Sequence, residues 1–180
     1  VLAQTRSASA VIVVDDGSDD DSVAAAVGMF PAVTLIRQQH LGTGPARNRG
    51  AAATDSEAIL FLDADDLLRL DALATLGAAF DADRQIDLVH GRMHEFVDEH
   101  NPPAAGMRHA ESEVVARLAG STLIRRSFWD RTGGMDEGLA RGEWIDWMSR
   151  ALGLSPRVAE VDAVVLERRL HASNKSATAG

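Results

Sequence analysis

The sequence predicts an α/β domain with a mostly parallel sheet flanked by helices. Short segments rich in Val, Ile and Leu recur along the first half of the chain, and a segment that permits a helix follows each of the first three. Such alternation is typical of parallel sheets covered by helices. Two of the apolar segments also end in several aspartates. In an open parallel sheet ligands bind beyond the carboxyl ends of the strands, so these aspartates indicate a binding site.

Continuous apolar or β-branched runs identify the strands of the first half, and helical spacing of apolar residues identifies its helices. The first strand ends at Asp16-Gly17-Ser18, and Ser18 or Asp19 is expected to cap the following helix. Gly42, Gly44 and Pro45 then loosen the chain before the second helix. We expect strands at 10–15, 33–38, 58–63 and 86–93, and helices at 20–28, 46–54 and 67–80.

The regular alternation stops near residue 98. We expect a loop at 100–109, a strand at 121–126 and an amphipathic helix at 142–153 that Gly153 ends. No low-complexity linker or internal repeat separates the two halves, so we predict one domain over residues 1–180. Its functional halves are expected at 1–97 and 98–180.

Composition excludes several classes of protein. The formal net charge of −9 argues against a nucleic-acid partner. The absence of cysteine excludes disulfides, thiolate nucleophiles and cysteine-based zinc sites. No apolar run reaches the roughly 18 to 20 residues of a transmembrane helix. We therefore expect a cytoplasmic protein, or one peripheral to the inner face of a membrane.

Two acidic strand ends are the candidate site. Asp15 and Asp16 follow one apolar run, and Asp63, Asp65 and Asp66 follow another. Both groups are expected to line one crevice. In strand-like geometry the two carboxylates of Asp63-Ala64-Asp65 would lie on one side of the chain, where they suit Mg²⁺ or Mn²⁺. Alternatively, Asp65 and Asp66 cap the helix that is predicted from Leu67.

Three segments together resemble the family 2 type of nucleotide-sugar glycosyltransferases with the GT-A fold. They are VVDDGSDDDS, GTGPARNRGAAA and ILFLDADDLL, in that order. The resemblance is best over residues 1–70, and the family's first strand is not recognisable in this sequence. By position it implies Asp15 and Asp16 at the base and ribose, Arg47 at the base or phosphates, Asp63 at the ribose and Asp65 at the metal. Gly17 and Ser18 are also expected to bind the nucleotide.

The second half resembles the acceptor side of the same family, in STLIRRSFWDRTGGMDEGL followed by GEWIDWMSRA. The resemblance implies that an acid near the start of the helix is the general base, and we favour Asp146 over Glu143. These acids could instead only complement the helix dipole. Trp144 and Trp147 are either core residues or, with one of them exposed, an apolar platform for an acceptor sugar. The spacing R-R-x-H-x-x-N is similar to the end of some members and implies that His171 contacts metal or diphosphate.

The resemblance thus implies transfer of a sugar with inversion, from a nucleotide-diphosphate donor to an acceptor hydroxyl, with Mg²⁺ or Mn²⁺. A UDP-linked donor is favoured, and the acceptor is an unknown glycan, lipid or small molecule. One alternative is a noncatalytic sugar-nucleotide-binding or protein-binding domain of the same fold. An Asp-x-Asp phosphatase is disfavoured because the chain has one lysine, Lys175, and nucleotidyl transfer because no basic Gly-rich loop follows the first strand.

Overall fold

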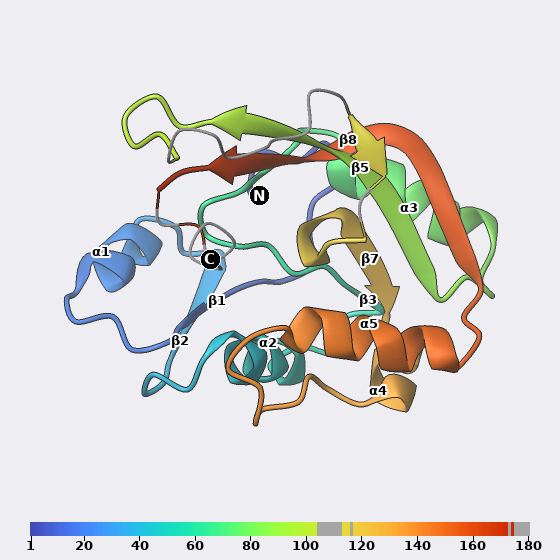
Figure 1. Cartoon of the computed structure of the whole chain (residues 1–180), viewed down its shortest axis with the longest axis horizontal. Coiled ribbons are helices and arrows are strands. Elements are labelled where there is room, and N and C mark those ends of the chain that lie inside the picture. Colours follow the sequence, from blue (N-terminus) through green and yellow to red (C-terminus); the bar gives the residue numbers. More distant parts are fainter. Residues whose placement is uncertain (104–112, 116, 173, 175–180) are drawn as a thin grey trace. The chain divides into compact units, whose positions relative to one another are not determined.

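The computed structural model describes residues 1–103, 113–115, 117–172 and 174 (Figure 1). The described residues form two compact units, each built from segments that lie far apart in the sequence. The β1–β2 unit comprises Ala8–Ile59 and Ile124–Arg157. The β5–β8 unit comprises Val1–Ser7, Leu60–Leu123 and the chain from Val158 onward.

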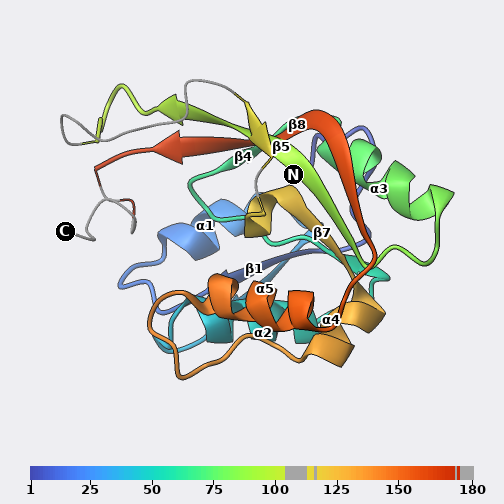
Figure 2. The same cartoon turned by 45° about the vertical axis from the view of Figure 1, so that its right-hand side comes forward.

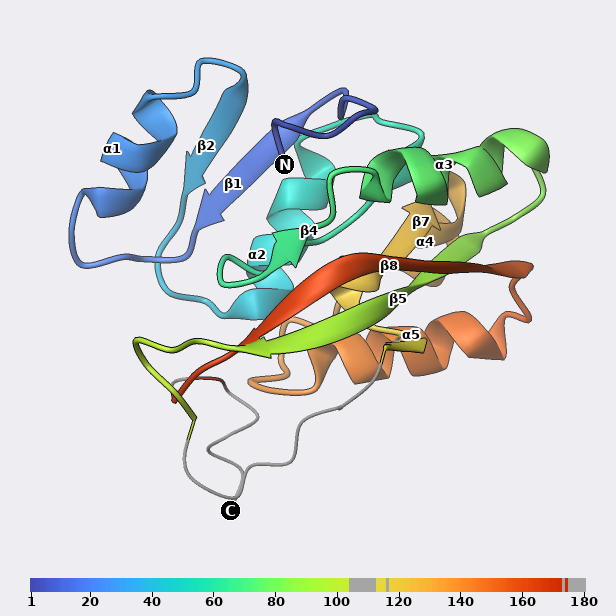
Figure 3. The same ribbon diagram turned by 90° about the horizontal axis from the view of Figure 1, so that it is seen from above.

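A parallel ladder forms the centre of the β1–β2 unit. Strands β1 (Val11–Asp15) and β2 (Val33–Arg37) pair in register from Val11 opposite Val33 to Asp15 opposite Arg37 (Figure 3). Helix α1 (Ser22–Gly28) connects them and packs on β2. Helix α2 (Thr43–Ala52) packs on β1. Residue 50 of α2 is glycine, which lets the helix approach β1 closely, since a Cβ there would lie 3.4 Å from a methyl group of Val14.

Two further helices complete this unit, α4 (Arg126–Thr132) and α5 (Glu143–Gly153). They pack through aromatic rings. Trp147 stacks on Trp129 and on Trp144, with ring centroids 5.1 and 5.2 Å apart, and meets Phe128 edge-on. All four rings are buried. The interpretation of Trp144 and Trp147 as core residues is therefore confirmed, and neither is an exposed platform. Strand β3 (Ala58–Ile59) pairs antiparallel with the last two residues of β7 (Thr122–Arg125).

The β5–β8 unit is built around a second parallel ladder. Strands β5 (Leu88–Val97) and β8 (Val158–Leu170) run alongside each other over their length (Figure 2). β4 (Leu67–Leu68) pairs antiparallel with β8, and β6 (Val114–Val115) pairs antiparallel with β5. β7 follows a 3₁₀ turn (Ala119–Ser121) and lies beside β5 in the sheet order.

Helix α3 (Ala72–Ala82) covers this ladder and packs on both β5 and β8 (Figure 3). Leu76 of the helix and Leu88, Val89, Val165 and Leu166 of the strands are almost fully buried and form the core. Burial of such side chains stabilises the unit by about 1.5–3 kcal/mol each. Among the described residues, no helix is long and apolar enough to cross a membrane.

The structure confirms the α/β class and most of the predicted elements. Strands are present at the segments predicted at 10–15, 33–38, 86–93 and 121–126, and helices at those predicted at 20–28, 46–54 and 142–153. The two longest ladders are parallel and the antiparallel pairs are short.

Three expectations were wrong in detail. Only Ala58–Ile59 of the strand predicted at 58–63 is a strand. The helix predicted from Leu67 begins at Ala72, because Leu67–Leu68 pairs with β8 instead. Helix α1 begins after Asp21, whose side chain makes no capping bond, and neither Ser18 nor Asp19 caps it.

Helix α4, the short strand β6 and the long strand β8 were not predicted from the sequence. The loop predicted at 100–109 lies mostly outside the described residues, as does Lys175. The expected division of function near residue 97 stays a prediction.

Candidate active site

Asp15 ends β1 with its carboxylate turned inward. Its side chain is 3% exposed and lies 3.3 Å from Nε of Arg37. The carboxylate also accepts a hydrogen bond from the Ser18 amide at 2.9 Å. Hydrogen bonds from Ser18, together with the charge of Arg37, hold the pKa of Asp15 below its usual range. Asp15 is therefore an ionised group that shapes the turn at the end of the strand.

Glycine is required at the next turn position. Gly17 has a φ of +87°, and a Cβ there would lie 2.7 Å from the backbone nitrogen of His40. A side chain at this position is disfavoured both by the backbone conformation and by the contact. The DDGS segment thus packs closely against the loop that follows β2.

Asp16 organises that loop. Its carboxylate accepts hydrogen bonds from the Gln38 side chain at 2.7 Å, the Leu41 amide at 2.9 Å and the Gly42 amide at 2.8 Å. Burial would raise the pKa of Asp16, but these hydrogen bonds outweigh burial and leave the pKa below its usual range. Asp16 therefore fixes the backbone immediately before α2 and carries a negative charge there.

Helix α2 presents Arg47 to the start of α5 and Asn48 to the segment that precedes α5. Nη1 of Arg47 lies 3.4 Å from Oε1 of Glu143, and their side chains are 11% and 14% exposed. Asn48 donates to the carbonyl of Met135 and to Oε1 of Glu137, each at 2.9 Å. Gly44 permits this packing, since a Cβ there would lie 3.2 Å from the carbonyl oxygen of Asp136.

Glu143 and Asp146 both occupy the first turn of α5, as predicted, but their surroundings differ. Oδ2 of Asp146 accepts a hydrogen bond from Nε of Arg150 at 2.9 Å. Arg150 also donates to the carbonyls of Thr132 and Gly134, at 2.9 and 2.8 Å. Asp146 thus orients an arginine that fixes the segment after α4.

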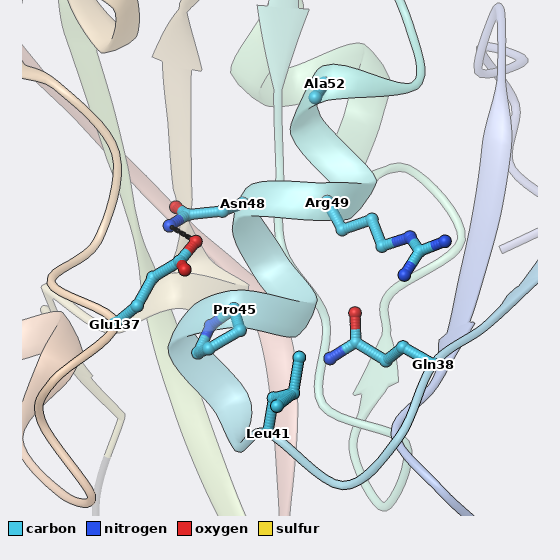
Figure 4. Close-up of a pocket in the computed structure, with 7 residues that line it drawn as sticks. All are labelled: Gln38, Leu41, Pro45, Asn48, Arg49, Ala52 and Glu137. Carbon is cyan, nitrogen blue, oxygen red and sulfur yellow. Dashed lines mark hydrogen bonds between the residues drawn. The ribbon is translucent and has the colours of Figure 1, made fainter.

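A groove of about 290 Å³ lies along one face of α2 (Figure 4). Asn48 and Glu137 line one side of it, and Gln38 and Arg49 line the other (Figure 4). Leu41, Pro45 and Ala52 are its apolar residues. None of the predicted nucleotide-binding residues lines this groove.

The second acidic cluster lies in the β5–β8 unit and has turn geometry. The Asp66 amide donates to the carbonyl of Asp63 at 3.2 Å, which closes a turn over Ala64-Asp65. The expectation that Asp63 and Asp65 continue a strand was therefore wrong. The helix-capping alternative for Asp65 and Asp66 was also wrong, because α3 begins only at Ala72, after Asp71.

The end of β8 returns to this turn. Nε2 of His171 lies 2.8 Å from Oδ2 of Asp65, although the two residues are 106 positions apart in the sequence. Nε of Arg169 donates to the Asp65 carbonyl, and its amide donates to Oδ1 of Asp66, both at 3.0 Å. The Asn174 side chain donates to the carbonyl of Arg169 and lies 3.5 Å from Oδ2 of Asp65.

Negative charge is concentrated at this turn. Burial raises the pKa of Asp66 to about 6; the Arg169 amide opposes the shift, and the charges of Asp65 and Asp63 add to it.

A cation beside Asp65 would relieve this repulsion, and a carboxylate with a neutral imidazole is a donor pair that suits Mn²⁺ or Mg²⁺. In the described part of the chain no group of three or more His, Asp or Glu could hold an ion. A bound ion would therefore take further ligands from water or substrate.

The structure thus brings the predicted residues together in two sets. Asp15, Asp16, Gly17, Ser18, Arg47, Glu143 and Asp146 belong to the β1–β2 unit, and Asp63, Asp65 and His171 belong to the β5–β8 unit. That the two sets line one crevice stays a prediction.

Sequence reasoning missed the residues that support these groups. Gln38, Asn48 and Arg169 were assigned no role, although each fixes a candidate residue or its loop. Asn174 was noticed only through its spacing from His171.

Comparison with known proteins gives a consistent result. The family model for glycosyl transferase family 2 matches residues 1–135. A pre-mycofactocin glycosyltransferase of Mycobacterium tuberculosis is 31% identical over 164 residues, which cover 82% of this chain and 35% of that protein. The succinoglycan biosynthesis protein ExoU of Rhizobium meliloti is 31% identical over 177 residues, covering 83% of this chain and 50% of that protein. The chain therefore spans half or less of the length of these curated relatives.

Among solved structures, S. aureus TarS residues 1–349 in complex with UDP superimposes with a TM-score of 0.73 at 19% sequence identity. The match covers 93% of this chain and 54% of that one. At this level of identity the likeness establishes the fold, which is the GT-A fold expected from the sequence.

Proposed function

The chain belongs to glycosyl transferase family 2, and we propose that it transfers a sugar from a nucleotide-diphosphate donor to an acceptor hydroxyl. The observation that carries the proposal is the contact between Asp65 and His171. A carboxylate and an imidazole that meet from distant segments, beside two more carboxylates, suit a cation that holds a diphosphate. Family membership supports the same chemistry.

The favoured donor is a UDP-sugar. The TarS structure with UDP supports this choice, because its fold matches 93% of the present chain. We assign Asp15, Asp16 and Arg47 to the nucleoside and phosphates and Asp63 to the ribose. Carboxylates accept hydrogen bonds from ribose hydroxyls and base N–H groups.

We propose Asp65 and His171 as the residues that hold one Mg²⁺ or Mn²⁺. Such an ion supplies positive charge where the leaving diphosphate gains negative charge. Asn174 and Arg169 would keep the two ligands in place through their hydrogen bonds at this turn.

For the general base we propose Glu143, although the sequence favoured Asp146. The Asp146 carboxylate accepts a hydrogen bond from Arg150, and Arg150 is held in place by two backbone carbonyls, so Asp146 is engaged in a structural contact. The contact of Glu143 with Arg47 is longer, at 3.4 Å, and Arg47 is itself assigned to the donor. In an inverting transfer this carboxylate removes the proton of the acceptor hydroxyl as that oxygen attacks the anomeric carbon opposite the diphosphate.

The acceptor is an unidentified glycan, lipid or small molecule. The relatives carry names of different products, a mycofactocin precursor and succinoglycan. Those names therefore do not select one acceptor class for this chain.

Release of UDP from UDP-sugars, with Mn²⁺ or with EDTA, tests the proposal. We expect metal-dependent release by the wild type and a loss of about 100-fold or more in Asp65→Asn, since the metal contributes several kcal/mol. Asp162→Asn is the matched control, because Asp162 is an 86% exposed carboxylate of the same unit. Release that EDTA and Asp65→Asn leave unchanged would contradict the metal assignment. Nucleotide binding without any turnover would favour the noncatalytic domain.

The two candidate bases are separated by isosteric amides. Glu143→Gln should lower the rate of transfer by about 100- to 10,000-fold, the range of general base catalysis. Asp146→Asn should lower stability and affect turnover less. The opposite ranking would return the role of base to Asp146.

A further inference from the structure

The amide of Asn48 makes three hydrogen bonds to one short segment. Nδ2 donates to the Met135 carbonyl and to Oε1 of Glu137, both at 2.9 Å, and Oδ1 accepts from the Met135 amide at 2.7 Å. Figure 4 shows the Asn48 and Glu137 side chains meeting at the edge of the α2 groove. The amide nitrogen and the amide oxygen of Asn48 therefore both have partners, and these partners require one orientation of the amide.

The same segment is fixed from its other side by α5. Nε1 of Trp147 donates to the Gly133 carbonyl at 2.9 Å, and Arg150 donates to the carbonyls of Thr132 and Gly134. Residue 134 must be glycine for the Asn48 contact, since a Cβ there would lie 2.7 Å from Oδ1 of Asn48. The segment 132–137 therefore joins α2 to α5 through side-chain contacts at both faces.

Five residues, 138–142, connect this segment to Glu143, the first residue of α5. A Cβ on Gly44 would lie 3.2 Å from the Asp136 carbonyl oxygen and 3.6 Å from Cβ of Glu143, so the backbones are in close contact here. The position of Glu143 relative to Arg47 then depends on how the 132–137 segment lies on α2. Asn48 fixes that placement.

We propose that Asn48 is a positioning residue, which holds the 132–137 segment on α2 so that Glu143 is placed for proton removal from the acceptor. This inference rests on the proposed function. Asn48 itself touches no reacting atom. Because misplacement of a catalytic group by about 1 Å can cost about 100-fold in rate, loss of this contact should affect turnover more than donor binding.

The first test is Asn48→Ala, assayed for kcat, donor Kd and hydrogen exchange. We expect kcat to fall by about 10- to 100-fold, UDP affinity to stay within about twofold, and the Met135 amide and its neighbours to exchange faster. The exchange readout reports the segment itself and does not depend on activity.

Arg126→Ala is the matched control. Arg126 donates to the carbonyls of Ala51 and Thr54, at 2.9 and 2.7 Å, and so fixes the C-terminal end of the same helix. Its loss should destabilise α2 as well, but kcat of the folded enzyme should change by less than about threefold, since misplacement of Glu143 is not involved. If both variants lost kcat equally, general stability of α2 would account for the effect and the proposal would be overturned.

A pair of charge variants gives a rescue test. Asn48→Asp places a second carboxylate beside Glu137 and should lower kcat at least as much as Asn48→Ala. Glu137→Gln alone should be nearly neutral, since its amide oxygen can still accept from Asn48. Combined with Asn48→Asp, Glu137→Gln should recover part of kcat, because its amide nitrogen can donate to the new carboxylate. No recovery would count against the contact between these two positions.

The outcomes separate this inference from the proposed function. Faster exchange with kcat unchanged would overturn the positioning role, and unchanged exchange would overturn the structural contact. If the wild type transferred no sugar from any donor, the proposed function and the positioning role would fail together. Exchange at Met135 would then still decide whether Asn48 holds the segment.

Discussion

His90 should make the stability of the protein fall in mild acid. It lies on β5 and is fully buried. Nδ1 lies 2.9 Å from the Thr122 hydroxyl, and Nε2 has no hydrogen-bond partner among the described residues. Burial, with the charge of Arg117 in addition, lowers the pKa of His90 from 6.5 to about 4, and Glu160 opposes the shift.

The sign and size follow from proton linkage. Between the two pKa values the unfolded chain binds a proton at this histidine and the folded chain does not, so acid favours unfolding. The contribution of His90 to stability is therefore complete above pH 6.5 and is lost as the pH falls toward 4. At pH 5 the loss amounts to about 2 kcal/mol, and its limit below the folded pKa is about 3 kcal/mol.

The assay is urea unfolding of wild type and His90→Asn at pH 8 and pH 5, followed by far-UV circular dichroism. Asparagine cannot titrate and keeps a polar atom near Thr122, while the packing defect that it creates does not depend on pH. Other titrating groups cancel in the difference between the two proteins. We expect His90→Asn to be less stable at pH 8, and the deficit to shrink by about 2 kcal/mol at pH 5. A deficit that is the same at both pH values would refute the reasoning.

Three further predictions concern the candidate site. Asp16→Ala should lower the free energy of unfolding by about 2–3 kcal/mol, because it removes three hydrogen bonds to an ionised group, whereas Asp19→Ala should change it by less than about 0.5 kcal/mol in the same urea titration. Gly17→Ala should cost about 1–3 kcal/mol because of its positive φ and the His40 contact, and an unchanged melting temperature would count against that geometry. His171→Ala should abolish the extra thermal stabilisation by UDP that Mn²⁺ provides, and a metal-dependent shift of wild-type size would remove His171 from the ion.

The elements predicted from the sequence were those whose signal is local. β1 was predicted because its β-branched residues are continuous, and α5 because its apolar residues recur at helical spacing. β8 was missed although it begins with alternating residues, because the alternation breaks at Val164–Leu166 where both faces become half-buried or buried. The run at 58–63 was predicted too long because only Ala58–Ile59 has a partner, at the end of β7.

The candidate site divides in the same way. The acidic residues themselves were visible in the sequence, since each group follows an apolar run. Most of their partners were not, because hydrogen bonds such as that of Asp16 with the Gly42 amide or of Asp66 with the Arg169 amide join positions 26 and 103 residues apart. A spacing rule cannot predict such contacts. The turn at Asp63–Asp66 was likewise missed, because its apolar lead-in resembles a strand.

The stacked indoles between α4 and α5 have a spectroscopic consequence. The chain has three tryptophans and no tyrosine, and all three tryptophans belong to this one stack. Intrinsic fluorescence excited at long ultraviolet wavelength therefore reports melting of the β1–β2 unit alone, while the unit that contains Asp65 and His171 has no tryptophan and does not contribute to it. Emission and far-UV dichroism followed together would reveal whether the two units melt as one or in sequence.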